Sequence, residues 1–180
     1  MQKVFLALAS LLFVMPLTAA TLTDPPAKEE INWVSMEEAV ALNRDNPRKI
    51  LIDVYTDWCG WCKRMDATTY EHPEVVKYIN ENYYAVKLDG EGKEEIQFKG
   101  NTFKFVPNGR RGYHEFAAAL MQGKMSYPTT IFMDEELNLL SPVPGYQKAE
   151  SFYMILSYFG KNLHKSRDFQ EYRKSYQSPF

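Results

Sequence analysis

Two cysteines, Cys59 and Cys62, have the residue type and spacing to support chemistry, and they are the only cysteines in the chain of 180 residues. They directly follow an apolar, β-branched run at residues 50–55, which predicts a strand. A helix that begins at Gly60 would place the Cys59 sulfur beside unpaired backbone N–H groups, whose partial positive charge favours thiolate over thiol. We therefore expect Cys59 to attack a partner's disulfide and Cys62 to resolve the mixed disulfide.

Two other interpretations of the cysteine pair are open at this point. A permanent structural disulfide is one, although closing so short a loop removes little entropy from the unfolded chain and stabilises little. A metal site is the other, but a closed zinc site takes four ligands, and His72, His114 and His164 are not at ligand spacing from the cysteines. The exchange chemistry itself requires no metal and no diffusible cofactor.

The sequence around the pair resembles the thioredoxin superfamily. In that family an apolar strand with an embedded Asp leads into a motif like Trp-Cys-Gly-Trp-Cys-Lys at residues 58–63. Farther along, Ser-Tyr-Pro-Thr-Thr at residues 126–130 precedes an apolar run and is similar to the family's cis-proline segment. The Cys-Gly-Trp-Cys form of the motif and the Lys-x-Met-Asp run at residues 63–66 resemble thioredoxin-like proteins exported by Gram-negative bacteria. The resemblance extends from about residue 33 to 160 and implies a three-layer α/β fold with a mixed central sheet and an insertion before the cis-proline.

The resemblance also implies roles for residues around the cysteines. Asp53 matches the family's buried acid, which would lie beneath the sulfurs and relay the proton of Cys62; burial of such a carboxyl raises its pKa. The alternative is an Asp53 side chain that faces solvent.

The expected substrate-binding residues are Trp58, Gly60, Trp61, Tyr127 and Pro128. If the Tyr127–Pro128 bond is cis, which the sequence does not show, the backbone of Tyr127 can pair with an extended substrate strand.

Trp61 occupies a position at which the family most often has proline. A backbone N–H is restored there, and it offers the Cys59 thiolate one more possible donor. Such a donor would stabilise the reduced form and make the protein more oxidising. Alternatively, the Trp61 indole covers the sulfurs and limits access to them.

The first twenty residues predict export. Lys3 precedes an almost wholly apolar run at residues 4–14 and a small-residue segment that ends at Ala20, as in a secretory signal peptide. The apolar run is too short to span a bilayer comfortably, so we expect no permanent membrane span after cleavage. A periplasmic or secreted location follows, in which disulfides persist. The net charge of −2, without a basic cluster, gives no support for nucleic-acid binding.

The remaining chain divides into a short leader, one domain and an extension. We predict a flexible leader at 21–30, a thioredoxin-like domain at 31–160 with an insertion at about 90–126, and a C-terminal extension at 161–180 that forms either a docked helix or a frayed tail. Within the insertion, a hairpin is expected to pair residues 96–98 with 103–105, followed by a helix that includes Tyr113. The insertion either shapes partner choice or packs its aromatic residues on the core.

A helix is predicted before the cysteine motif. Ser35 and Glu38 predict a capping box that opens a helix, with Met36, Ala39, Val40 and Leu42 as candidate buried positions.

These features together predict an extracytoplasmic thiol:disulfide oxidoreductase that acts on protein substrates with disulfides or thiols, in the reductase or isomerase direction. A reductase in an oxidising compartment needs electrons from across the membrane, which implies a membrane thiol reductase as partner. The alternative is a non-catalytic binding module, such as a chaperone or a copper carrier that uses both thiols.

Overall fold

The computed structural model describes residues 28–180, so the predicted signal peptide at 1–20 and most of the predicted leader at 21–30 lie outside the described residues. A mixed five-stranded sheet forms the centre of the molecule, as the sequence predicts. In spatial order its strands are β1 (Trp33–Val34), β3 (Tyr83–Asp89), β2 (Lys49–Tyr55), β8 (Thr129–Met133) and β9 (Leu139–Pro144).

The central strand β2 determines how the cysteine motif is presented. It pairs in parallel with β3 and antiparallel with β8, and all but the last of its seven residues are buried. A strand covered on both faces has no solvent side, which explains its nearly continuous apolar sequence. The chain leaves β2 at Tyr55 and reaches the first cysteine four residues later.

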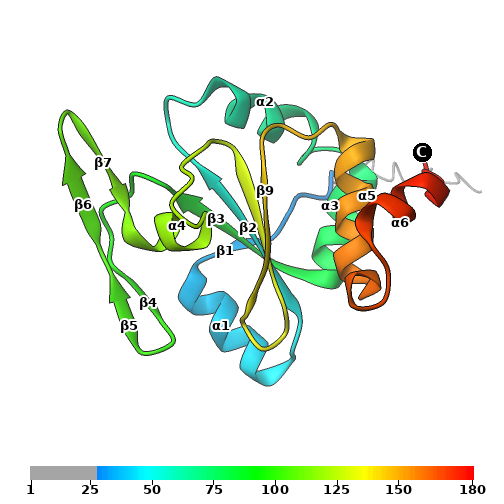
Figure 1. Ribbon diagram of the computed structural model, residues 1–180, viewed down its shortest axis with the longest axis horizontal. Helices are drawn as coiled ribbons and strands as arrows, with labels where there is room; N and C mark the ends of the chain where they lie inside the picture. Colours follow the sequence, from blue (N-terminus) through cyan, green and yellow to red (C-terminus); the bar gives the residue numbers. More distant parts are fainter. Residues whose placement is uncertain (1–27) are drawn as a thin grey trace, which may run out of the picture.

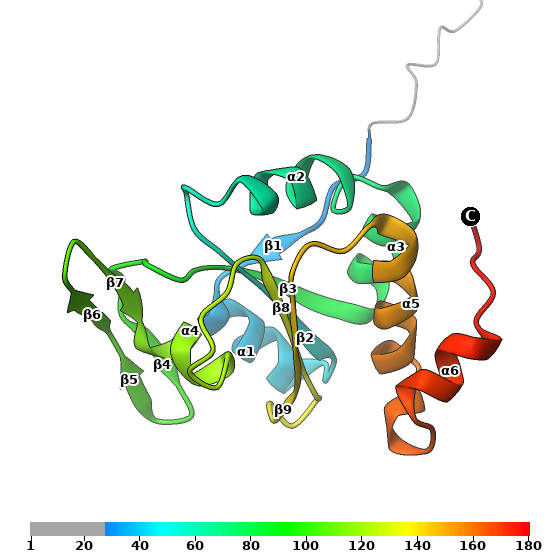
Figure 2. The ribbon, with the colours of Figure 1, turned by 45° about the horizontal axis from the view of Figure 1, so that its top comes forward.

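Helices cover both faces of the sheet (Figures 1 and 2). On one face, Met36 and Phe116 join the alternate β2 residues Ile50 and Ile52 in one apolar cluster. On the other face, Leu51 of β2 packs in a second cluster that includes Met65. The first face carries α1 (Met36–Asp45) and α4 (Glu115–Leu120), and the second carries α2 (Gly60–Thr68), α3 (Pro73–Asn82) and α5 (Ala149–Gly160).

The predicted start of α1 is confirmed, but one of its expected core positions is wrong. Ser35 caps the helix, and its Oγ accepts a hydrogen bond from Glu38 N at 3.1 Å. Met36 and Ala39 are buried, whereas Leu42 is 39% exposed. Asn43 takes the buried place instead, because it continues the helix face of Met36 and Ala39 and its Nδ2 donates to Arg48 O at 2.6 Å.

The insertion contains two hairpins, not one. The first pairs β4 (Ile96–Phe98) with β5 (Asn101–Phe103), and its turn is Lys99-Gly100, where both residues have positive φ. This tight turn places Phe98 opposite Asn101, so the expected pairing with residues 103–105 is wrong. The second hairpin pairs β6 (Phe105–Asn108) with β7 (Arg111–His114) and places Tyr113 in a strand instead of a helix. In Figure 1 both hairpins extend from the side of the sheet opposite α5.

The C-terminal segment forms a further helix, α6 (Phe169–Ser175), after a short 3-10 turn, η1 (Leu163–Lys165). Tyr172 of α6 is buried, and its ring stacks on Tyr158 of α5 with 5.5 Å between centroids. Asp168 caps the helix through a hydrogen bond from Gln170 N at 2.8 Å. Among the described residues, no helix has the length and apolar character required to cross a membrane.

Candidate active site

The two cysteines form a disulfide at the amino end of α2. Cys59 is the N-cap of the helix, and its Sγ accepts a hydrogen bond from Cys62 N at 3.1 Å. No acidic side chain lies in the first turn of α2 to offset the positive end of the helix dipole. The Cys59 sulfur therefore lies where a negative charge on it would be stabilised by a backbone N–H group and by the helix as a whole.

Two exposed tryptophans flank the nearly buried sulfurs. Cys59 and Cys62 are 5% and 2% exposed, whereas Trp58 and Trp61 are 52% and 58% exposed. A Cβ atom built on Gly60 would have no atom within 4 Å, so the helix start between the indoles is open. The two indole rings pack against different tyrosines, Tyr127 for Trp58 and Tyr146 for Trp61.

The segment from Tyr127 to Pro128 lies beside the first of these tryptophans. Its peptide bond is cis, and the Tyr127 ring meets Trp58 edge to face with 5.8 Å between centroids. Pro128 is buried, and its carbonyl accepts a hydrogen bond from Gly145 N at 2.8 Å. Within residues 28–180, the backbone N–H and C=O of Tyr127 have no backbone hydrogen-bond partner.

Asp53 is buried on the face of β2 that α2 covers, so the solvent-facing alternative is wrong. The residue is 1% exposed and lies two positions after Leu51, which packs against the α2 side of the sheet. Its Oδ2 accepts a hydrogen bond from Lys87 Nζ at 2.8 Å, whereas Oδ1 has no partner among the described residues. Burial raises the pKa of the Asp53 carboxyl, and the ammonium of Lys87 opposes that increase only in part.

Lys87 is a site residue that the sequence interpretation missed. Its ammonium bridges Asp53 of β2 and Asp66 of α2. Burial acts to lower the pKa of Lys87, but the two carboxylates outweigh that effect and the pKa is raised. The signal was present in the sequence, because a lysine in an otherwise apolar strand marks a position with a buried partner.

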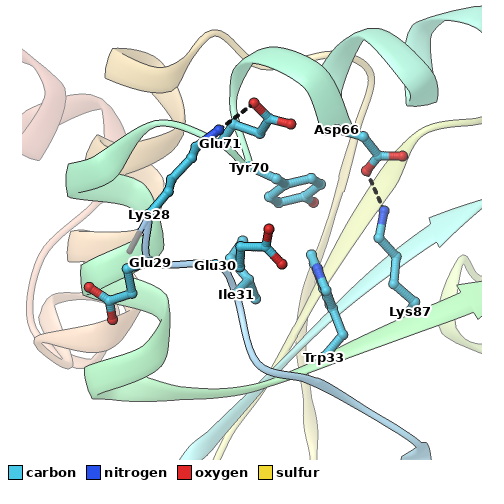
Figure 3. A pocket seen from close by; sticks show the side chains of 9 residues that line it. All are labelled: Lys28, Glu29, Glu30, Ile31, Trp33, Asp66, Tyr70, Glu71 and Lys87. Carbon is cyan, nitrogen blue, oxygen red and sulfur yellow. Dashed lines mark hydrogen bonds and ion pairs between the residues drawn. The ribbon is translucent and has the colours of Figure 1, made fainter. Parts of the chain in front are cut away.

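Aromatic rings surround this ammonium. Lys87 Nζ lies 4.9 Å from the ring centroid of Trp33 and 5.2 Å from those of Tyr55 and Tyr70. Figure 3 shows Lys87 and Asp66 at one end of a pocket of about 260 Å³, with the ion pair of Lys28 and Glu71 at the other. The carboxyl network therefore has an opening toward solvent next to Lys87.

His114 and His72 take structural positions in this fold. His114 is buried, its Nδ1 accepts a hydrogen bond from Phe116 N at 3.1 Å, and its Nε2 pairs with Glu94 O at 2.9 Å. His72 stacks on Phe180. Residues 28–180 contain no group of three or more His, Cys, Asp or Glu side chains placed to hold a metal ion.

The three-layer fold and the disulfide at the start of α2 define the class: this chain is a thioredoxin-like protein with a Cys-x-x-Cys disulfide. Residues 21–171 match the family model named Thioredox_DsbH, described as a protein of unknown function, DUF255, and the chain belongs to that family. The superfamily resemblance predicted from the two sequence motifs is thus confirmed.

The chain is also similar to parts of longer proteins. The chain is 23% identical over 141 residues to the thiol:disulfide interchange protein DsbD of Haemophilus influenzae (strain PittEE), with 75% of this chain and 21% of that protein covered. Overall it spans 12% and 21% of the lengths of the curated relatives that it matches.

Solved structures support the fold. A thioredoxin-fold protein from Helicobacter pylori superposes with a TM-score of 0.54 at 19% identity, covering 72% of this chain and 80% of that chain. A DsbH oxidoreductase gives the same TM-score at 16% identity, with 81% and 94% covered.

Proposed function

We propose that this protein exchanges disulfides with protein substrates outside the cytoplasm, with Cys59 as the nucleophile and Cys62 as the resolving thiol. The observation that carries this proposal is the hydrogen bond from Cys62 N to Cys59 Sγ at the amino end of α2. It supports Cys59 as the nucleophile, because a thiolate at this position would be stabilised by the amino end of the helix.

The exchange balances as two sulfur substitutions. In the reduced protein, the Cys59 thiolate attacks one sulfur of a client disulfide, a Cys59–client bond forms, and the other client sulfur leaves as a thiolate. Cys62 then loses its proton and attacks Cys59 Sγ, which releases the second client thiolate and forms the Cys59–Cys62 disulfide. The client gains two electrons and the protein loses two.

Asp53 is the proposed acceptor for the proton that Cys62 must lose. A carboxyl whose pKa is raised by burial takes up a proton at a higher pH than an exposed aspartate does. Its Oδ1 has no competing partner among the described residues. The position of Asp53 on the α2 face of β2 supports this role.

Tyr127 and Pro128 are proposed to hold the client chain. The backbone N–H and C=O of Tyr127, which have no backbone partner among residues 28–180, can hydrogen-bond an extended client segment as a strand would. Trp58, Gly60 and Trp61 would then contact the side chains beside the client cysteine, since they form the exposed surface around the sulfurs.

The reductase or isomerase direction and the extracytoplasmic location are also part of the proposal. The signal-like segment at residues 1–20 supports export, and the family match begins at residue 21. The similarity to a protein named thiol:disulfide interchange protein supports exchange with other redox proteins. In an oxidising compartment, a membrane thiol reductase would return Cys59 and Cys62 to the dithiol form.

A trapping experiment tests the proposal. In Cys62→Ser the mixed disulfide at Cys59 cannot be resolved, so we expect covalent client adducts in extracts of the periplasm that dithiothreitol releases. The double variant Cys59→Ser/Cys62→Ser is the control and should capture nothing. If Cys62→Ser forms no adducts, and the wild type reduces no model disulfide while binding Cu(I) tightly, a copper carrier replaces the enzyme.

A further inference from the structure

Two arginines stack on the two tryptophans that flank the disulfide. The guanidinium carbon of Arg111 lies 4.2 Å from the ring centroid of Trp58. On the other side of the cysteine motif, the guanidinium carbon of Arg64 lies 5.7 Å from the Trp61 centroid and 5.9 Å from that of Tyr146. The sulfurs are therefore bordered on both sides by an arginine held over an indole ring.

The Arg111 stack brings the insertion to the redox site. Arg111 belongs to β7 in the second hairpin, and Trp58 immediately precedes Cys59. The first hairpin packs on the core instead: Phe98 and Phe103 each contact Phe116 with 5.1 Å between ring centroids. The insertion thus divides between one hairpin that fills the core and one that supplies a charged side chain beside the cysteines.

Both guanidinium groups are available to a carboxylate. The side chain of Arg111 is 56% exposed, and its one ion pair in the described part of the chain is a long contact of 3.9 Å with Glu91. Arg64 is exposed and forms no ion pair with any of residues 28–180. An arginine stacked on a ring keeps its N–H groups free in the plane of the guanidinium, where they can bind a carboxylate in a bidentate manner.

We propose that Arg64 and Arg111 select clients that carry acidic side chains on both sides of the reactive cysteine. This inference rests on the proposed function and adds the class of substrate. The stacking restricts each guanidinium before the client arrives, so less side-chain entropy is lost on binding. The amino end of α2 adds positive potential between the two arginines.

Acidic groups near the site limit the strength of this selection. Asp57 is exposed and precedes Trp58, and Glu91 lies near Arg111. A client carboxylate that binds Arg111 competes with Glu91, whose long contact leaves the other N–H groups of the guanidinium without a carboxylate. Each arginine is therefore expected to raise the rate with an acidic client over that with a neutral client only modestly, by about two- to fivefold.

The test measures single-turnover reduction of peptide disulfides by the pre-reduced protein. Three peptides are compared that differ only in the residues flanking the cysteines: Glu, Gln or Lys. We expect the wild type to react roughly five- to tenfold faster with the Glu peptide than with the Gln peptide, slowest with the Lys peptide, and with a smaller difference at high salt.

Two double variants with the same change in net charge distinguish binding of the client by Arg64 and Arg111 from a general effect of the protein's charge. In Arg64→Gln/Arg111→Gln the ratio of the rates with the Glu and Gln peptides should fall to about one, mainly because the rate with the Glu peptide falls. The control Lys77→Gln/Arg110→Gln removes two exposed cations that stack on no tryptophan, and it should keep the wild-type ratio. The reduction potential of each variant is measured beside these rates.

The outcomes distinguish this inference from the proposed function. If the wild type reduces all three peptides equally, or if the arginine variant keeps the Glu preference, the selection of acidic clients is overturned and the exchange function is unaffected. If the variant slows equally with all peptides and changes potential, the arginines act through Cys59 and not through the client, which also overturns it. If the wild type reduces no peptide, the exchange function is overturned as well.

Discussion

The ammonium of Lys87 lies 2.8 Å from Oδ2 of Asp53, and the two residues are direct partners in the register of β3 and β2. The same ammonium contacts Asp66 of α2. One cation therefore joins the central sheet to the helix that begins at the cysteines. This arrangement holds the buried Asp53 carboxyl in place, but the ion pair offsets only part of the free-energy cost of burying that carboxyl.

The first prediction is that Asp53→Asn stabilises the protein at neutral pH. The pKa of Asp53 is higher in the folded protein than in the unfolded chain. Protonated Asp53 therefore stabilises the folded protein fully at a pH below the unfolded-state pKa, and this stabilisation is lost as the pH rises through the folded-state pKa. Asparagine removes that loss, and we expect the free energy of unfolding to rise by roughly 1–3 kcal/mol at pH 7. Urea unfolding at pH 3.5 and pH 7 checks this, and a gain of equal size at both pH values would contradict it.

The same variant should slow the second exchange step. Without the Asp53 carboxylate, Cys62 has lost its proposed proton acceptor, so resolution of a mixed disulfide at Cys59 should slow by about 10²-fold at neutral pH. Rapid-quench measurement of the mixed disulfide with a fluorescent peptide gives this rate. The first step should be nearly unchanged, and a variant that resolves at the wild-type rate removes Asp53 from the mechanism.

A third prediction concerns Lys87. Lys87→Met removes the cation that lowers the pKa of Asp53, so that pKa should rise further. The pH at which resolution reaches half its maximal rate should move upward by about one unit or more. Asp66→Asn is the control, since it leaves Lys87 with Asp53 alone and should move the profile downward or not at all. A profile that does not move in Lys87→Met would show that Asp53 does not control the step.

A fourth prediction concerns Gly90, which packs against Tyr127 of the cis-proline segment. A Cβ atom at Gly90 would overlap the ring of Tyr127. Gly90 is also fixed on both sides, because its N–H donates to Tyr55 O at 2.8 Å and its C=O accepts from His114 N at 2.8 Å. We expect Gly90→Ala to displace Tyr127, cost about 1–3 kcal/mol of stability and raise the KM for peptide disulfides.

Gly60→Ala is the matched control for Gly90→Ala. It adds the same atom in open space and should leave stability within about 0.5 kcal/mol of the wild type. Equal losses of stability in both variants would contradict the packing argument.

A fifth prediction concerns Trp61. In the disulfide form, the N–H group of Cys62 donates to Cys59 Sγ. The N–H group of Trp61 lies in the same helical turn and has no backbone acceptor among residues 28–180, so it is a second possible donor. Trp61→Pro deletes that donor in the first helical turn, where proline is tolerated. The wild type should therefore have a higher reduction potential than Trp61→Pro in a glutathione titration, and an equal or lower wild-type potential would contradict the hypothesis.

The fold was predictable from sequence because its signals are local. The buried strand β2, the Ser35 capping box and the cysteine spacing each follow from a few adjacent residues. The second hairpin was missed because Pro107 and Gly109 interrupt its alternation, so the segment does not look like a strand pair.

The chemical surroundings of the cysteines were only partly predictable. Asp53 was found because a carboxyl in an apolar strand is a local anomaly. Its bridge through Lys87 to Asp66 depends on the register of two strands and a helix, and the stack of Arg111 on Trp58 joins residues more than fifty positions apart. Such contacts become visible only when the chain is folded.

The most direct test of the account is the pKa of the Cys59 thiol in the reduced protein. It is obtained from the pH dependence of iodoacetamide alkylation in Cys62→Ser, where Cys59 is the remaining cysteine. We expect a pKa well below about 8.5, the value of a free cysteine, with rapid alkylation at neutral pH. A pKa at or above that value, with alkylation no faster than that of free cysteine, would contradict the claim that the amino end of α2 activates this sulfur.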